Sequence, residues 1–142
     1  MALFRAGRMA GVVVLDASAL IALHDSEDRH HTWARGMFLD TIDATLAMSV
    51  LTYAEVLVHP TRAGKVAEFE QNIAGLGIEI VTVGAGDALA LAHLRASTSL
   101  KMPDVIVLHL AVGLGASLAT TDEGLATEAA RSGVAVLQPE PA

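Results

Sequence analysis

The chain contains no cysteine among its 142 residues. This absence excludes a disulfide framework, a thiolate metal site and a cysteine nucleophile. Long apolar runs are missing too, since no segment approaches the roughly 18 consecutive apolar residues that cross a bilayer. The apolar run over residues 11–15 is too short for the core of a signal peptide, and Asp16 interrupts it. We therefore expect a cytoplasmic protein with no membrane partner.

Positive charge is scarce as well. Nine Lys and Arg face sixteen Asp and Glu, which gives a formal net charge of −7. This balance argues against a protein that coats nucleic acid through its global charge, so any attraction of RNA must come from a local patch. The candidate cations for phosphate contacts are Arg62, Lys65, Arg95 and Lys101. Surface solubility explains each of these cations equally well.

Apolar residues, in contrast, make up 53% of the chain. Some of that apolar surface is expected to be covered by a partner or by a second copy. The length is that of one domain, and no internal repeat, low-complexity tract or long linker divides it. We expect an N-terminal extension over residues 1–10 and a single domain over residues 11–142.

Short β-branched runs alternate along the chain with longer segments of helical spacing. The predicted strands are Val12–Leu15, Thr45–Ser49, 78–83, 117–120 and 134–137. The predicted helices are 18–24, 28–40, 52–59, 63–76 after a break at Pro60, 87–96, 103–113 and 123–132. This alternation predicts an α/β fold in which helices cover both faces of a mostly parallel five-stranded sheet.

Four acidic residues stand where an apolar run meets a helix: Asp16, Glu55, Asp104 and Asp122. Because open α/β sheets bind ligands beyond the carboxyl ends of their strands, we expect these acids to converge at one sheet edge. Like charges held close are unfavourable unless a cation neutralises them or some are protonated. Oxygen ligands without cysteine favour Mg²⁺ or Mn²⁺. The chemistry that most often needs such a cluster is phosphodiester hydrolysis.

Each acid taken alone has an ordinary structural explanation. Asp16 and Asp122 could cap the helices that follow them. Asp104 could complement a helix dipole from the first turn, and Glu55 could be an exposed helix residue. Four such residues in one ordered pattern favour the functional interpretation. Asp87 follows the sequence GAG at a helix start, and there we expect a structural cap.

Five segments in order resemble a PIN domain, and in particular the VapC-type toxin of type II toxin–antitoxin systems. They are LDASALIAL, LTYAEVLVHPTRAGK, ALAHLRA, LKMPDVIVLHLAVGLGA and LATTDEGLA, which together cover most of residues 11–137. The resemblance implies a three-layer PIN fold and Mg²⁺- or Mn²⁺-dependent endoribonuclease activity on RNA. It also implies a homodimer and a cognate antitoxin protein that inhibits the enzyme.

The resemblance also assigns roles to the four acids. Asp16, Glu55 and Asp104 match the three core acids of the family, and Asp122 matches the more variable fourth. Asp16 and Asp104 would bind the metal directly. Glu55 and Asp122 would complete the site directly or through water, because Mg²⁺ usually keeps several waters.

Ser18 and Thr120 match supporting hydroxyl positions of the family, which would orient a carboxylate or a water. Ser18 also argues against a haloacid dehalogenase-type phosphatase, which needs a second acid at that place. A phosphoacceptor receiver domain has paired acids near its first strand, whereas Leu15 precedes Asp16 here. The remaining alternative is a PIN fold that serves as a non-catalytic RNA-binding or scaffold module.

Overall fold

Five parallel strands form the central sheet of the computed structural model, which describes residues 4–5, 8–9 and 11–141. The strand order is β5-β4-β3-β6-β7. The strands are β3 (Val12–Leu15), β4 (Thr45–Ser49), β5 (Glu79–Val81), β6 (Ser117–Ala119) and β7 (Val136–Leu137). Val13 lies opposite Leu46 on one side and Ser117 on the other, so β3 is the middle strand. The predicted five-stranded α/β fold is confirmed, and every strand pair in the sheet is parallel.

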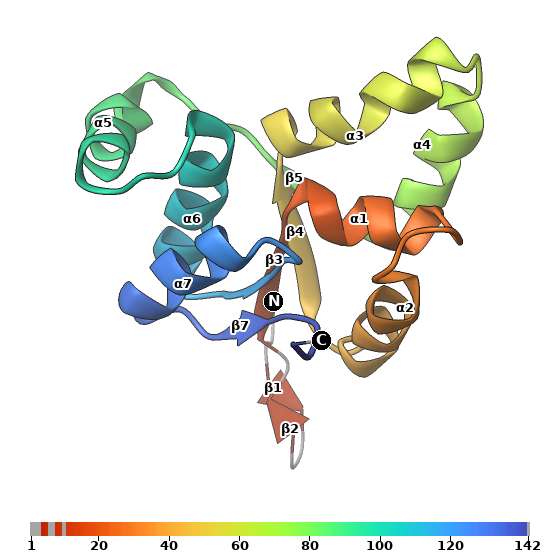
Figure 1. The fold of residues 1–142 in the computed structure, drawn as a ribbon, viewed down its shortest axis with the longest axis horizontal. Coiled ribbons are helices and arrows are strands. Elements are labelled where there is room, and N and C mark those ends of the chain that lie inside the picture. The colour runs from red at the N-terminus through yellow and green to blue at the C-terminus, as the bar shows by residue number, and fades with distance from the viewer. Residues whose placement is uncertain (1–3, 6–7, 10, 142) are drawn as a thin grey trace.

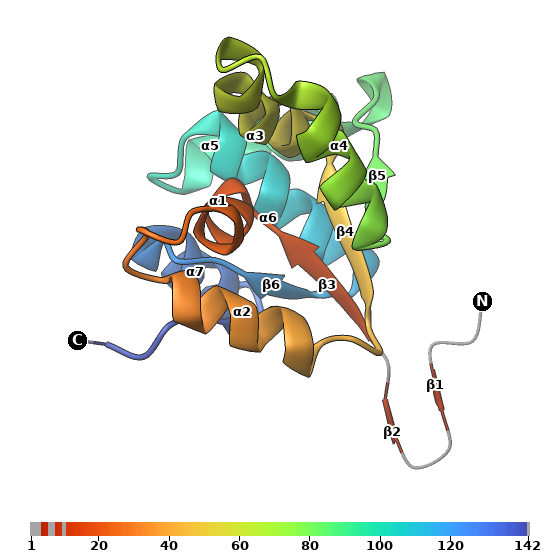
Figure 2. The same ribbon diagram turned by 90° about the vertical axis from the view of Figure 1, so that its right-hand side faces the viewer.

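Helices cover both faces of this sheet in three layers. They are α1 (Ala17–His24), α2 (His31–Asp40), α3 (Val50–Arg62), α4 (Val66–Gly75), the 3₁₀ turn η1 (Ala85–Asp87), α5 (Ala88–Ser97), α6 (Met102–Leu114) and α7 (Glu123–Arg131). Figure 1 shows α5, α6 and α7 on one side of the sheet and α1 to α4 on the other, and Figure 2 shows the same layers from the side.

The sheet separates two apolar cores because successive strand residues point to opposite faces. Val14 packs on one face against the buried residues of α6 and α7, among them Leu108 and Leu125. Val13 and Leu15 face the other side and join the core under α1 to α4. Helix α6 is buried in its middle, at Val105–Leu108 and Ala111, whereas its two ends are exposed.

The predicted helix break at Pro60 is wrong. Helix α3 continues through Pro60 to Arg62. The proline stands in the last turn, where its missing N–H removes one intrahelical bond, and its ring is buried. The helix ends at Arg62, and two residues later Gly64 adopts a φ of 70° that favours glycine. The following helix, α4, therefore begins at Val66 and not at residue 63.

Helix α2 also begins later than predicted, at His31 and not at residue 28. The side chain of Asp28 accepts a hydrogen bond from the backbone N–H of His30 at 2.8 Å, which holds a turn in place of a first helical turn. The strands β5 and β7 are shorter than the predicted ranges 78–83 and 134–137.

The extension predicted over residues 1–10 is described only in part. Strands β1 (Phe4–Arg5) and β2 (Arg8–Met9) pair antiparallel with each other. They form a separate two-stranded sheet, and the other residues of this range lie outside the described residues. Among the helices that the structure describes, none is long and apolar enough to cross a membrane.

Candidate active site

The strand order reverses at β3, which pairs with β4 on one side and with β6 on the other. Asp16 follows β3 directly, and Thr120 follows β6. The backbone N–H of Asp16 donates to the carbonyl oxygen of Ala119 at 3.3 Å, so the two strand ends stay together. Ligands of open α/β sheets bind at such a reversal, beyond the carboxyl ends of the strands.

Asp16 is the most buried of the four acids, with 5% of its surface exposed. Its Oδ1 accepts hydrogen bonds from Ser18 Oγ at 2.6 Å and from the backbone N–H of Ala19 at 3.0 Å. Its Oδ2 accepts from the hydroxyl of Thr120. Asp16 therefore does cap α1, and the same contacts fix the carboxylate in one orientation.

The two hydroxyl residues join chain segments that are far apart in sequence. Ser18 Oγ accepts from the backbone N–H of Thr121 at 2.9 Å. Thr120 Oγ1 accepts from the backbone N–H of Asp122 at 2.9 Å. Asp122 in turn accepts from the N–H of Leu125 at 2.9 Å and caps α7. The part played by Thr121 was missed by sequence reasoning, because a backbone N–H carries no residue-type signal.

Asp104, in the first turn of α6, is the acid whose pKa depends on all three of the others. Burial is the largest cause that raises its pKa, to about 6. The charges on Asp122, Asp16 and Glu55 raise that pKa further, in this order. Lys101 opposes them with its positive charge. The pKa of Asp104 therefore depends on the charges of all three other acids.

The pKa values of two other acids change in the same direction. Burial raises the pKa of Asp16, and the hydrogen bonds from Ser18, Thr120 and Ala19 partly oppose this rise. Glu55 is an exposed residue of α3. Partial loss of hydration is the larger cause that raises the pKa of Glu55, and the negative charge on Asp16 raises it further. The cluster therefore favours either protonation or a bound cation.

The donor set fits a hard divalent cation, since it consists of carboxylate oxygens. Within the described ranges, no group of three or more His, Asp or Glu side chains is already arranged to hold a metal ion. Mg²⁺ is usually bound through one or two carboxylates and keeps several waters, so its binding does not require a preformed three-ligand cage.

Comparison with known families matches residues 13–130 to the model of the PIN domain. The chain belongs to the PIN domain family. The matched range runs from β3 into α7 and contains all four acids. No curated protein sequence matches the chain.

Solved structures share the fold of this PIN domain. A toxin–antitoxin complex from Klebsiella pneumoniae is 24% identical with a TM-score of 0.67, over 80% of this chain and 90% of that chain. VapBC2 from Rickettsia felis, bound to a promoter DNA fragment, is 13% identical with a TM-score of 0.68, over 89% of this chain and 98% of that chain. FitAcB from Neisseria gonorrhoeae is 20% identical with a TM-score of 0.68, over 88% of this chain and 96% of that chain.

The candidate cations lie at different distances from the acids of the PIN domain. Lys101 directly precedes α6, and its charge lowers the pKa of Asp104. Arg62 is the last residue of α3, and Arg95 lies on α5. Lys65 lines a groove between α1, α3 and α4, and none of the four acids lines that groove.

Asp87 belongs to a different part of the PIN domain. Its Oδ1 accepts from His109 Nε2 on α6 at 2.9 Å, and its Oδ2 accepts from the backbone N–H of Gly84 at 2.9 Å. The hydrogen bond from His109 is the main reason that the pKa of Asp87 lies below its ordinary value. These contacts tie the start of α5 to α6. The expected cap is not formed, because the Asp87 side chain makes no capping hydrogen bond to α5.

Asp87→Asn should leave catalysis within about threefold of wild type and lower the melting temperature at neutral pH. The ionised carboxylate stabilises the fold above its unfolded pKa, and this contribution is lost as pH falls through the lower folded pKa. The melting temperature of Asp87→Asn should therefore lie below that of wild type at neutral pH and equal it at acidic pH, which thermal melts at both pH values measure. A large loss of cleavage would instead place Asp87 in the active site.

Proposed function

We propose that this PIN domain is a Mg²⁺- or Mn²⁺-dependent endoribonuclease and the toxin of a type II toxin–antitoxin system. The observation that carries the proposal is the hydrogen bonding of Thr120, whose hydroxyl donates to Asp16 and accepts from the backbone N–H of Asp122 at the ends of β3 and β6. The raised pKa of Asp104, to which the charges on Asp122, Asp16 and Glu55 contribute, supports a cluster of four carboxylates at this edge, where α/β folds bind ligands. A single structural cap needs no such neighbours.

Asp16 and Asp104 are the proposed metal ligands, with Glu55 and Asp122 beside them. When bound, the ion supplies activation of water and stabilisation of negative charge on the phosphate. Ser18 and Thr120 hold the carboxylate of Asp16 in place through the hydrogen bonds described above. Lys101, beside Asp104, is the cation best placed to attract the phosphate backbone of RNA to this edge.

The proposed partners are a cognate antitoxin and a second copy of the chain. Related folds occur in a solved toxin–antitoxin complex and in VapBC2. Exposed apolar side chains on α1 and α3, including Ile21 and Leu51, offer surface for a protein partner. Leu89 on α5 and Val112 on α6 are 71% and 50% exposed and offer a second such surface.

A non-catalytic scaffold is the second candidate function. It is favoured by the lack, in the part of the chain that the structure describes, of three acidic or histidine side chains already arranged around a metal position. Titration with Mn²⁺ separates the two candidates. A nuclease should bind Mn²⁺ and lose most of that affinity on Asp104→Asn, whereas a scaffold need not bind it.

Growth of bacteria after induction of the protein tests the proposal without a guess about the RNA. Wild type should arrest growth, and Asp104→Asn at matched expression should not, because a metal ligand is lost while the fold persists. Asp40→Asn, an equivalent change at an exposed position of α2, is the matched control and should arrest growth like wild type.

Arrest by wild type and Asp40→Asn alone supports a carboxylate-dependent toxic activity, and RNA from the arrested cells then shows which species is cut. Arrest by all three proteins would mean toxicity that does not depend on catalysis. Growth with all three would favour the scaffold, or a target that the host lacks, and Mn²⁺ titration would then decide.

A further inference from the structure

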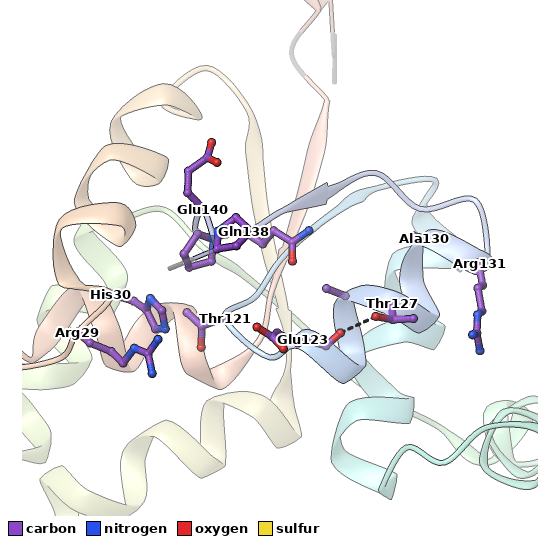
Figure 3. A pocket seen from close by; sticks show the side chains of 12 residues that line it. Arg29, His30, Thr121, Glu123, Thr127, Ala130, Arg131, Gln138 and Glu140 are labelled. Atoms are coloured by element: carbon purple, nitrogen blue, oxygen red, sulfur yellow. Dashed lines mark hydrogen bonds between the residues drawn. The ribbon is translucent and has the colours of Figure 1, made fainter.

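A cavity of ≈ 960 Å³ opens where β6 leads into α7. Thr121 and Glu123, the two chain neighbours of Asp122, line it (Figure 3). Its other walls come from the turn between α1 and α2, from α7 and from the C-terminal residues 138–141. The cavity has the size of a small-molecule pocket, so it fits single nucleotide units and not a duplex.

The turn between α1 and α2 brings Arg29 and His30 to this cavity on a well-held backbone. Asp28 accepts a hydrogen bond from the N–H of His30 at 2.8 Å. The next residue, His31, bonds through Nδ1 to the carbonyl oxygen of Ala22 at 2.8 Å, which fastens the turn to α1. The hydrogen bonds therefore hold the backbone that carries Arg29 and His30, which lowers the entropic cost of binding a ligand.

Charge on the cavity lining differs from charge on the chain as a whole. Two arginines and two glutamates line it, so its formal charge is zero, against −7 for the chain. Figure 3 shows Arg29 and His30 on the side of Thr121 and Arg131 on the far side. Arg131 pairs with Glu128 at 3.1 Å. Arg29 is exposed and makes no ion pair with the rest of the described chain.

We propose that this cavity, in line with the proposed nuclease function, is a subsite for single-stranded RNA beside the phosphate that is cut. Arg29 contacts a neighbouring phosphate of the strand, because its planar guanidinium matches phosphate oxygens and is free to do so. His30 adds a second polar contact from the same turn. Thr121 joins the subsite to the acids, since its backbone N–H is bonded to Ser18.

Binding of a short fluorescein-labelled single-stranded RNA of mixed sequence, followed by anisotropy, tests this subsite without cleavage. Every protein in the series carries Asp104→Asn. Arg29→Ala should weaken binding about fivefold and reduce the salt dependence by roughly one phosphate contact. Arg35→Ala is the matched control, because Arg35 is equally cationic and exposed but lines a different cavity. It should change binding less than about twofold.

Two further variants make the charge argument specific. Arg29→Lys should recover part of the affinity, because it keeps the charge and loses the planar fork. Glu123→Gln should tighten binding about twofold, since it removes a negative charge from the wall nearest the acids. Equal affinity of Arg29→Ala and Arg35→Ala would overturn the subsite, and so would RNA that binds none of the proteins.

Cleavage assays with Asp104 restored separate this inference from the proposed function. Arg29→Ala should raise KM about fivefold with kcat unchanged, as expected for a contact made equally in the ground state and transition state. A protein that binds RNA through Arg29 without cutting it would refute the nuclease and leave the subsite. Cleavage with no effect of Arg29→Ala on KM or on affinity would refute the subsite and leave the nuclease.

Discussion

Asp16→Asn should lower metal-dependent RNA cleavage by on the order of 10³-fold, because it removes a negatively charged oxygen from the proposed ion site. Loss of a catalytic metal removes several kcal/mol of transition-state stabilisation, and about 1.4 kcal/mol corresponds to a tenfold change in rate. The fold should persist, since asparagine still offers a side-chain oxygen to the N–H of Ala19 and remains a good N-cap. Cleavage of a mixed single-stranded RNA with Mn²⁺ measures the first effect, and thermal melting measures the second.

Asp16→Ala separates the catalytic role of this residue from its structural role. Alanine leaves Ser18, Ala19 and Thr120 without their acceptor in a buried place, which costs about 2–4 kcal/mol of stability. Its melting temperature should therefore fall well below that of Asp16→Asn, while both variants are inactive. An asparagine variant that melts as low as the alanine variant would show a mainly structural carboxylate. Cleavage within about tenfold of wild type would remove Asp16 from the ion site.

The contacts of Asp16 illustrate what the sequence could and could not predict. Capping and ion binding were weighed as alternatives, and Asp16 and Asp122 do cap α1 and α7. The hydrogen bonds of Asp16 with Ser18 and Thr120 show that a cap can also hold a carboxylate beside other acids. Each local signal was thus present in the sequence, and only the fold shows that the capping carboxylate also bonds to Thr120 at the end of β6.

Local patterns predicted the strands and the helix order because burial imposes a period of two or 3.6 residues. They failed at Pro60, where packing of the ring overrides the usual helix break. They also gave no hint of Arg29, since the cavity beside Thr121 is built from segments that lie about 90–110 positions apart in the sequence. Sites assembled from distant loops depend on topology, which a single sequence encodes only indirectly.

Metal-free protein should lose stability as pH rises from about 4 to about 7, and added Mn²⁺ should restore it. The pKa of Asp104 is raised from 3.8 to about 6, so the folded state binds its proton more tightly than the unfolded state. The resulting stability is fully present below the unfolded pKa and is lost as pH rises through the folded pKa. Fully expressed, this shift corresponds to roughly 3 kcal/mol, and solvent screening of a half-buried carboxylate reduces it to about 1 kcal/mol.

Thermal melts across that pH range, with a chelator and with Mn²⁺, measure the effect as a few degrees for a chain of this size. Asp104→Asn should flatten the pH dependence in chelator, raise the melting temperature near pH 7 and weaken the response to Mn²⁺, because one repelling charge and one ligand are gone. Asp87→Asn is the control, since the pKa of Asp87 is lowered and its charge changes below this range. A wild type and an Asp104→Asn variant with identical pH profiles would mean that the acids do not form one electrostatic cluster. The proposed ion site would then lack its physical basis.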